Sequence, residues 1–251
     1  MGPDPHFPYL NGNRRYQFPP PEKARDGIVA IGGNLSPGML LSAYEQGIFP
    51  WYNPEDPLIW QSPDPRCVIF PEDLHVSRSM EKILKRRDFK ITLDRDFSAL
   101  IRACALAPRS GPEGTWITKD IIEGYTTLHT LGWAHSAEAW QNGCLAGGCY
   151  GIRLGKVFFG ESMCALVPNA SKAAFLSLAR FMFDDGLAFI DCQVPSEHLL
   201  SLGAKSISRE EYLLLLKKEL KVHFPLGSDS NNAGRRGSWN SLYADCLQHS
   251  R

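Results

Sequence analysis

The chain has 251 residues, of which 43% are hydrophobic and 22% charged, a composition typical of a globular protein with one large or two small domains. Its formal net charge is zero, so any binding of nucleic acid would depend on a local basic patch. No apolar run approaches the roughly 18 residues that span a bilayer, and the first residues lack the pattern of a signal peptide, so we expect a cytoplasmic protein without membrane contact.

The first 66 residues are expected to form a small, proline-rich N-terminal module. Of the 18 prolines, 13 fall within the first 71 residues, which indicates irregular, turn-rich structure. One helix is clearly bracketed: Ser36 is the expected N-cap, Pro37 occupies the first helical position, and Gly47 lies just past the end.

Residues 67–225 are expected to form a second, α+β domain, because helical periodicity gives way to alternation and then returns. In chain order the predicted elements are a helix after Ser77, a strand over 89–93, helices over 97–107 and 119–131, strands over 135–140, 144–154 and 156–161, a helix over 171–185 and a strand over 187–192. Asn142-Gly143 predicts a two-residue hairpin turn, and so a largely antiparallel sheet. Residues 226–251 include a low-complexity stretch and are expected to be a disordered tail.

Three polar residues follow two of these strands. Glu161 ends the strand over 156–161, and Asp191 and Gln193 end the strand over 187–192. The intervening helix returns the chain to the same edge, so we expect the three side chains to converge on one cleft, with Asp191 and Gln193 on one strand face. The alternative is an ordinary Asx-type turn at a strand end.

The seven cysteines form no Cys-x-x-Cys pair and no zinc-type spacing with the histidines. They are therefore expected to be reduced thiols, mostly buried, and no metal site is predicted. Cys192 lies between Asp191 and Gln193, but strand alternation turns it away from their shared face, which disfavours a nucleophilic role.

Several short motifs recur in the order and spacing of a known family. They are AIGGNLSP (30–37), GIFPW (47–51), WQSPDPR (60–66), GTWIT (114–118), GESM (160–163), NASK (169–172) and IDCQV (190–194). Together they closely resemble the bacterial leucyl/phenylalanyl-tRNA–protein transferases, over roughly residues 16 to 216. The resemblance implies an acyltransferase-type domain related to the acetyl-CoA-dependent N-acetyltransferases, with a mixed, largely antiparallel sheet.

The resemblance also implies an activity. Such an enzyme transfers leucine or phenylalanine, or methionine, from aminoacyl-tRNA to the α-amino group of proteins that begin with Arg or Lys, which marks them for degradation. An aminoacyl ester is already activated, so neither a cofactor nor a metal is expected. We expect a monomer whose partners are the charged tRNA and the acceptor protein.

A basic stripe is expected on the helix after Ser77. Its cationic residues recur at helical spacing and comprise Arg78, Lys82, Lys85 and Arg86. Met80, Ile83 and Leu84 are predicted to face the protein. The stripe on its own is typical of a solvated surface, and the resemblance implies that it binds the tRNA acceptor stem through phosphates.

Trp51 and Trp116 each end a short motif instead of fitting a hydrophobic period. They either fill a domain seam or stack on a base, and the resemblance implies that they hold the terminal adenosine of the tRNA. Tyr44 and Tyr125 lie on predicted helices nearby and are expected to line the same substrate site.

An apolar pocket is predicted beside Glu161 for the side chain of the transferred amino acid. The resemblance assigns to it Cys149, Phe158, Met163, Leu178 and Ile190. Periodicity alone would make these residues ordinary core. Family members tend to carry a larger apolar residue at Cys149, and often an aromatic residue at Leu178, so the choice between leucine and phenylalanine is open.

The predicted mechanism is aminolysis of the ester. Asp191 is expected to orient Gln193, whose amide oxygen accepts a hydrogen bond from the attacking amine. A carboxylate, either Glu161 or Asp191, is expected to attract the cationic acceptor. Two other classes remain: a coenzyme-A-dependent N-acyltransferase, which usually has a pyrophosphate-binding loop that is not seen here, and a non-catalytic tRNA-binding module.

Overall fold

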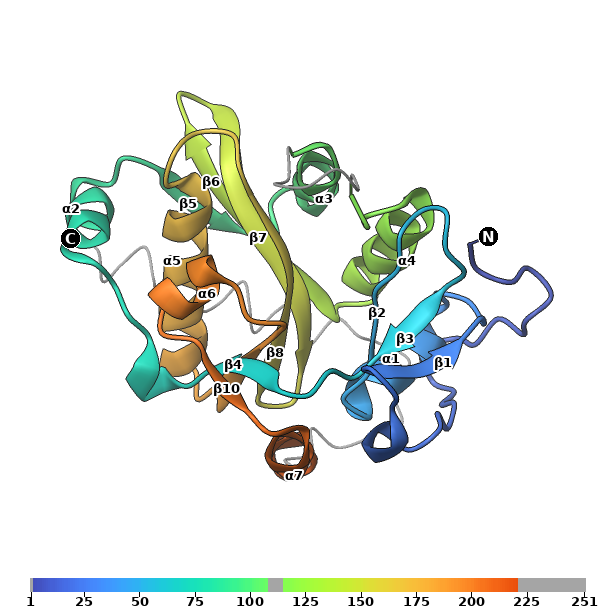
Figure 1. The fold of residues 1–251 in the computed structure, drawn as a ribbon. Helices are drawn as coiled ribbons and strands as arrows, with labels where there is room; N and C mark the ends of the chain where they lie inside the picture. The colour runs from blue at the N-terminus through green and yellow to red at the C-terminus, as the bar shows by residue number, and fades with distance from the viewer. Residues whose placement is uncertain (1, 108–114, 221–251) are drawn as a thin grey trace.

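A seven-stranded sheet forms the centre of the part of the chain that this computed structural model describes, residues 2–107 and 115–220 (Figure 1). From one edge to the other the strands are β10 (Lys205–Ile207), β4 (Arg66–Ile69), β9 (Phe189–Gln193), β8 (Val157–Ala165), β7 (Cys144–Leu154), β6 (Ala134–Gln141) and β5 (Lys90–Leu93). All neighbours are antiparallel except β8 and β9, which are parallel. The predicted α+β class with a mixed, largely antiparallel sheet is confirmed.

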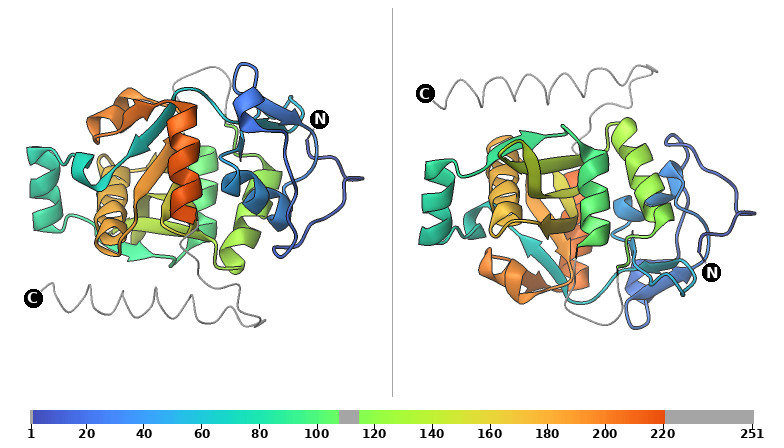
Figure 2. Two further views of the ribbon diagram at one scale, coloured as in Figure 1. Left: turned by 90° about the horizontal axis from the view of Figure 1, so that it is seen from below. Right: turned by 90° about the horizontal axis from the view of Figure 1, so that it is seen from above.

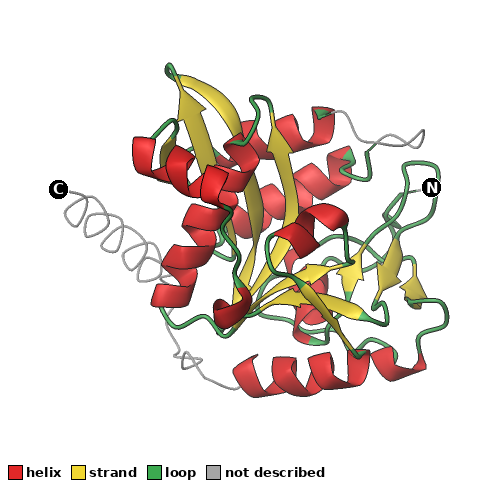
Figure 3. Ribbon diagram, turned by 60° about the vertical axis from the view of Figure 1, so that its left-hand side comes forward, coloured by secondary structure: helices red, strands yellow, loops and turns green. Residues whose placement is uncertain are grey.

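Helices cover both faces of this sheet (Figures 2 and 3). On one face α5 (Ala170–Asp184) packs against β5 to β8, with α2 (Arg78–Arg86) outside it and α6 (Glu197–Ser201) nearby. The core of the other face includes α3 (Phe97–Leu106), α4 (Lys119–Thr130) and α7 (Arg209–Leu220). None of the helices in the described ranges combines the length and the apolar character of a membrane span.

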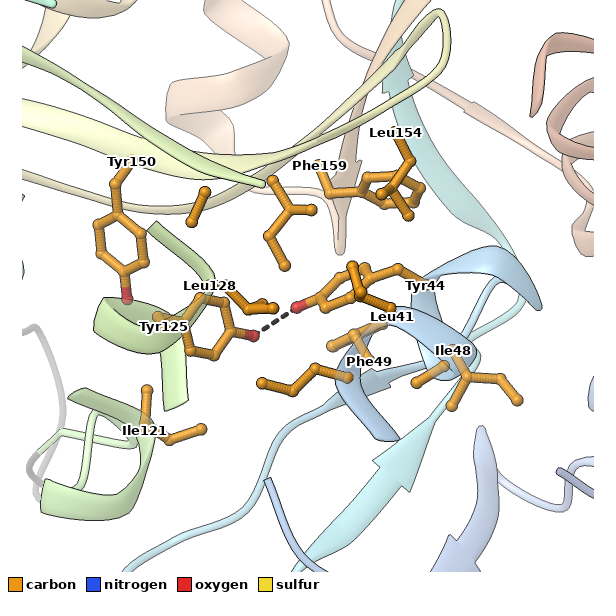
Figure 4. Packing of buried hydrophobic residues seen from close by; sticks show 14 of the residues in the cluster. Leu41, Tyr44, Ile48, Phe49, Ile121, Tyr125, Leu128, Tyr150, Leu154 and Phe159 are labelled. Atoms are coloured by element: carbon orange, nitrogen blue, oxygen red, sulfur yellow. Dashed lines mark hydrogen bonds between the residues drawn. The ribbon is translucent and has the colours of Figure 1, made fainter. Parts of the chain in front are cut away.

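The N-terminal unit is built around α1 (Pro37–Glu45) and a small sheet in the order β1 (Ile28–Ile31), β3 (Ile59–Gln61), β2 (Phe49–Pro50). The helix has the predicted bounds, and Gly47 after it adopts a φ of 76°, which favours glycine. The three strands were not predicted because each has only two to four residues. Side chains of α1 and α4 pack together under the large sheet (Figure 4).

Most elements of the second domain agree with the sequence-based prediction to within one or two residues. β7 has the predicted bounds, and Asn142 and Gly143 have φ of 52° and 80°, as a tight hairpin turn requires. One boundary was wrong: β8 continues to Ala165, so Glu161 lies within the strand. β4, β10, α6 and α7 were not predicted, and residues 221–251, including the predicted tail, lie outside the described ranges.

The parallel pairing of β8 with β9 positions the candidate site. It joins only Val157–Phe159 to Phe189–Asp191, with α5 as the crossover. Both strands continue past this ladder without pairing to each other. A cavity lies between the two strands beyond this ladder. It is lined by Gly160 to Met163 of β8 and by Cys192 and Gln193 of β9.

Candidate active site

A cavity of about 200 Å³ lies where β8 and β9 stop pairing. Its apolar lining residues come from β7, β8, β9, α5 and α6, and they include Cys149, Phe158, Met163, Phe175, Cys192 and Leu199. Its polar lining residues are Glu161, Ser162, Gln193, Ser196 and His198. Pockets for drug-sized ligands usually exceed about 300 Å³, so this cavity suits a single amino-acid side chain.

Two β-bulges shape this region. On β8, Ser162 pairs with Tyr150 and Gly160 with Gly151, which leaves Glu161 as the extra residue. On β9, Gln193 pairs with Cys67 and Asp191 with Val68, which leaves Cys192 as the extra residue. Bulges redirect side chains and are common beside active sites. They explain why polar side chains from neighbouring strands converge here.

Glu161 and Gln193, which both line the cavity, are hydrogen-bonded to each other. Nε2 of Gln193 donates to Oε1 of Glu161 at 3.1 Å. A carboxylate accepts only, so the atom of the Gln193 carboxamide that contacts Glu161 is Nε2 and not the carbonyl oxygen. That oxygen has no partner among the described residues and can accept a hydrogen bond from a ligand.

A line of buried hydroxyls supports Glu161 from the other side. The Tyr125 hydroxyl on α4 donates to Oε2 of Glu161 at 2.8 Å, and the Tyr44 hydroxyl on α1 is hydrogen-bonded to that of Tyr125 (Figure 4). Because Tyr125 has only one hydroxyl proton, Tyr44 is the donor in the second bond. We call Tyr44, Tyr125, Glu161 and Gln193 the relay.

Burial raises the pKa of Glu161 from its usual 4.5 to about 7. The hydroxyls of Tyr44 and Tyr125 oppose this rise, as does the positive charge of Arg66, whereas the negative charge of Asp191 adds to it. Burial also raises the pKa of both tyrosines well above their usual value, which keeps them protonated as donors. Glu161 therefore changes charge near neutral pH.

Asp191 does not line the cavity. It is fully buried in a bidentate ion pair with Arg66 of β4, in which Nε donates to Oδ1 at 2.9 Å and an Nη to Oδ2 at 2.7 Å. The Tyr212 hydroxyl of α7 donates to Oδ2 at 2.8 Å, and the backbone N–H of Gln193 donates to Oδ1 at 2.9 Å. We call Arg66, Asp191 and Tyr212 the anchor cluster.

The expected alternation of Asp191, Cys192 and Gln193 was therefore wrong. Gln193 has a φ of 57°, in the left-handed region, and the register shifts beside it. As a result Cys192 and Gln193 both line the cavity and Asp191 does not. Asp191 holds the backbone of Gln193, while Glu161 holds its carboxamide.

The predicted pocket residues fall into two groups. Cys149, Phe158 and Met163 line the cavity, whereas Leu178 and Ile190 are buried in the adjacent core and do not. Tyr44 and Tyr125 were expected to line the substrate site, but both side chains are fully buried and reach the cavity only through Glu161. The sulfhydryl of Cys149 is buried, which raises its pKa and keeps it a thiol.

The two predicted base-stacking residues lie outside the cavity. Trp51, just after β2, is 39% exposed and stacks on Phe49 with ring centroids 6.4 Å apart. Trp116, before α4, is half-buried against the buried cluster that the N-terminal unit shares with α3, α4 and one face of the large sheet. Their place in recognition stays a prediction.

The basic stripe has the predicted geometry. Its four cationic residues are exposed along α2, whereas Met80 is buried and Ile83 and Leu84 pack toward the core. Arg86 also pairs with Asp88 at 2.8 Å. No group of three or more His, Cys, Asp or Glu side chains that could hold a metal occurs in the described ranges.

Sequence reasoning gave no role to Arg66, Tyr212, Phe175, Leu199, Ser196 or His198. Arg66 lies in the motif WQSPDPR, but a basic residue that opens a short strand gives no sign of burial. Tyr212 and Leu199 lie in short or weakly patterned helices, so no periodicity pointed to them. His198 is distinctive in that Nε2 is buried with no partner in the described part of the chain.

Comparison with known proteins places the chain in a family. The family model described as leucyl/phenylalanyl-tRNA protein transferase matches residues 68–217, and a model of that family's N-terminal domain matches residues 33–64. The chain belongs to the leucyl/phenylalanyl-tRNA protein transferase family. The identification made from the sequence motifs is thereby confirmed, and the chain is an aminoacyltransferase.

Individual members of the leucyl/phenylalanyl-tRNA protein transferase family are similar over most of their length. The member from Syntrophotalea carbinolica is 52% identical over 80% of this chain and 87% of its own. The member from Hahella chejuensis is 48% identical over 88% of this chain and 94% of its own. A solved structure, L-PGS from Bacillus licheniformis, aligns with a TM-score of 0.41 at 8% identity, over 64% of this chain and 66% of that one.

Proposed function

We propose that the chain transfers leucine or phenylalanine, or methionine, from aminoacyl-tRNA to the α-amino group of proteins that begin with Arg or Lys, which marks them for degradation. Family membership supports the donor and the type of reaction. The observation that carries the proposal here is a largely apolar cavity the size of one side chain, whose lining includes Gln193 and Glu161. Because charged tRNA is a cytoplasmic substrate, we propose that the protein acts there, as a monomer.

The cavity takes the side chain of the transferred amino acid. Cys149, Phe158, Met163 and Phe175 give it apolar walls, so a hydrophobic side chain is favoured over a polar one. With that side chain against the apolar walls, the ester carbonyl of the donor lies toward Glu161 and Gln193. The attacking amine then meets the ester beside Gln193.

Gln193 orients the attacking amine. Its free amide oxygen accepts one N–H of the amine, and the bond of Nε2 to Glu161 fixes the direction of that oxygen. An amide oxygen is protonated only in strong acid, so Gln193 positions the amine and does not remove its proton. Asp191 acts through the Gln193 backbone and is sealed away from the substrate.

Of the two carboxylates considered for the acceptor, Glu161 is the better candidate. Asp191 is neutralised by Arg66 and fully buried, whereas Glu161 lines the cavity. We therefore propose that the positively charged acceptor end faces Glu161. Trp51 and Trp116 hold the terminal adenosine in this proposal, and Arg78, Lys82, Lys85 and Arg86 contact phosphates of the acceptor stem.

The proposal is tested by offering the protein alternative donors. Leucyl-tRNA, phenylalanyl-tRNA and acetyl-coenzyme A are each incubated with an Arg-initiated peptide, and the peptide mass is measured. We expect the mass of one leucine or phenylalanine residue to be added from the charged tRNAs and no acetyl group from the third donor. Acetylation would favour the N-acyltransferase, and tRNA binding without any transfer would favour the non-catalytic module.

A further inference from the structure

In the proposed function Glu161 lies beside the attacking amine. The hydrogen bond that orients Gln193 uses only one of the two oxygens of Glu161. We propose that Glu161 is the base that removes a proton from the α-ammonium group of the acceptor, and that Tyr44 and Tyr125 are positioning residues for this step. This inference rests on the proposed function, because it concerns the acceptor of the same transfer.

The Glu161 carboxylate has acceptor positions left for an ammonium group. A carboxylate offers about four acceptor positions. Gln193 occupies one at Oε1 and Tyr125 one at Oε2, at 3.1 and 2.8 Å. The amide oxygen of Gln193 is bonded to the same carbon as the Nε2 that contacts Glu161, so the two acceptors are neighbours. One ammonium group can donate to the Gln193 oxygen and to Glu161 at the same time.

The energetics of the proton transfer are balanced. The pKa of Glu161 is raised to about 7, chiefly by burial, and an α-ammonium group has a reference pKa of about 7.7–8.0. The groups with the largest effect on this pKa come from α1, α4, β4 and β9, and they are Tyr44, Tyr125, Arg66 and Asp191. The other titratable groups that line the same cavity are His198 of α6, Cys149 of β7 and Cys192 of β9. A base whose pKa lies close to that of its partner and to the working pH transfers a proton efficiently.

The step conserves protons and bonds. An N–H bond of the ammonium breaks and an O–H bond forms on Glu161, which leaves a neutral amine. The amine nitrogen then forms a bond to the ester carbonyl carbon, and the bond from that carbon to the ribose oxygen breaks. The second amine proton goes to the departing ribose oxygen, and Glu161 returns its proton to water after the products leave.

The relay is arranged to hold Glu161 as a carboxylate in one position. Tyr44 donates to Tyr125, Tyr125 donates to Oε2, and Gln193 donates to Oε1, so every proton in the relay points toward Glu161. Both tyrosine side chains are fully buried and cannot touch a substrate. Their effect on the reaction must pass through Glu161, which makes them positioning residues.

The test is the pH dependence of Glu161→Gln, which keeps an acceptor for Gln193 but cannot take up a proton. With leucyl-tRNA and an Arg-initiated peptide, we expect kcat/KM of the variant to fall roughly 100- to 10,000-fold near pH 7. The loss should shrink toward pH 9, where the amine is already neutral. A loss of the same size at every pH would overturn the proposal.

A second acceptor separates proton removal from a general defect. An otherwise identical peptide can carry an aminooxy group at its N-terminus in place of the α-amino group. The aminooxy group is neutral at pH 7, so no base is needed to deprotonate it. We expect Glu161→Gln and the unaltered protein to transfer leucine to it at rates within about tenfold of each other. If the variant is as defective with this acceptor as with the ordinary peptide, Glu161 is not the base.

The positioning residues have their own readout. Tyr125→Phe removes a donor that stabilises the Glu161 carboxylate, so the acidic limb of the kcat/KM profile should move to higher pH. A lower rate with an unmoved limb would overturn the positioning role. Absence of transfer by the unaltered protein at every pH would refute the proposed function itself, whereas transfer with an unchanged profile in Glu161→Gln would refute this inference alone.

Discussion

Asp191 and Arg66 form a bidentate ion pair in which both side chains are completely buried. Arg66 also donates to the carbonyl of Gly47 at 3.1 Å and lies over the rings of Phe49 and Tyr212, at 4.8 and 4.4 Å from their centroids. The pair therefore ties β9 to the N-terminal unit and to α7. Its consequence for catalysis is that Asp191 is a structural support for Gln193.

Asp191→Asn should reduce both transfer and stability. It leaves the Arg66 charge buried without its counter-ion, which lowers the free energy of unfolding by about 3–5 kcal/mol. The weaker hold on the Gln193 backbone should lower kcat by roughly 10- to 100-fold while tRNA affinity stays unchanged. Urea unfolding, transfer kinetics and a tRNA binding assay measure the three quantities.

A double variant serves as the control for this prediction. Replacing both partners, with Arg66→Met and Asp191→Leu, removes the uncompensated charge and should recover most of the lost stability. Transfer should remain impaired, because the leucine at position 191 offers no acceptor for the Gln193 N–H. Normal transfer by Asp191→Asn would remove Asp191 from the mechanism.

Removal of two charges from α2 should weaken tRNA binding. With Lys85→Ala and Arg86→Ala together, the slope of log affinity against log salt concentration should decrease by about two if both side chains touch phosphate. Transfer from a 3′-aminoacyl adenosine, which lacks the acceptor stem, should not change. The matched control is Lys217→Ala with Lys218→Ala, two exposed residues of α7. An unaltered slope in the α2 variant would make the stripe an ordinary solvated surface.

Cys149→Met should change the choice between donors. Cys149 is 4% exposed and lines the cavity, so a larger side chain there crowds a phenyl ring more than an isobutyl group. Each methylene in such a pocket is worth about 1–3 kcal/mol, so the leucine-to-phenylalanine ratio of kcat/KM should rise roughly tenfold. The variant must first show an unchanged melting curve.

Leu178→Met is the matched control for Cys149. Leu178 belongs to the same buried cluster but does not line the cavity, and the exchange nearly conserves volume. It should leave the donor ratio unchanged. If the folded Cys149→Met variant also kept the original ratio, Cys149 would be a core residue and not part of the side-chain pocket.

The raised pKa of Glu161 predicts how stability depends on pH. A carboxyl whose pKa is about 7 in the folded protein and 4.5 ordinarily binds its proton more tightly when folded. The stability it contributes is complete below about pH 4.5 and is lost as the pH rises to about 7. The variant Glu161→Gln has no carboxyl to titrate and so does not lose this stability. The difference in free energy of unfolding, variant minus unaltered protein, should therefore increase between about pH 4.5 and pH 7, by at most about 1.4 kcal/mol per pH unit. Urea unfolding at several pH values tests this, and a difference that does not vary with pH would contradict the raised pKa.

The elements around the site were largely predictable because their signals are local. Pro37 and Gly47 bracket α1, Asn142-Gly143 forms the hairpin turn, and alternation defines β7. The convergence of Glu161 with Gln193 followed from the expected crossover through α5. Each of these features depends on residues within one or two neighbouring elements.

The details of the site were not predictable because they depend on distant partners and on irregular backbone. Arg66 and Asp191 are 125 residues apart in the chain. The bulges at Glu161 and Cys192 break the alternation on which the strand-face prediction depended. Pattern alone cannot reveal that a charged residue such as Arg66 is buried, because burial is decided by what packs around it.

This chain is expected to join an amino acid from tRNA to a protein N-terminus. The most direct measurement is fragment-ion mass spectrometry of an Arg-initiated peptide after incubation with leucyl-tRNA, beside the same peptide with an acetylated N-terminus. We predict that one leucine residue is attached to the α-nitrogen of the free peptide and that the acetylated peptide is unchanged. An unmodified Arg-initiated peptide, or leucine attached to any other nitrogen, would contradict the account.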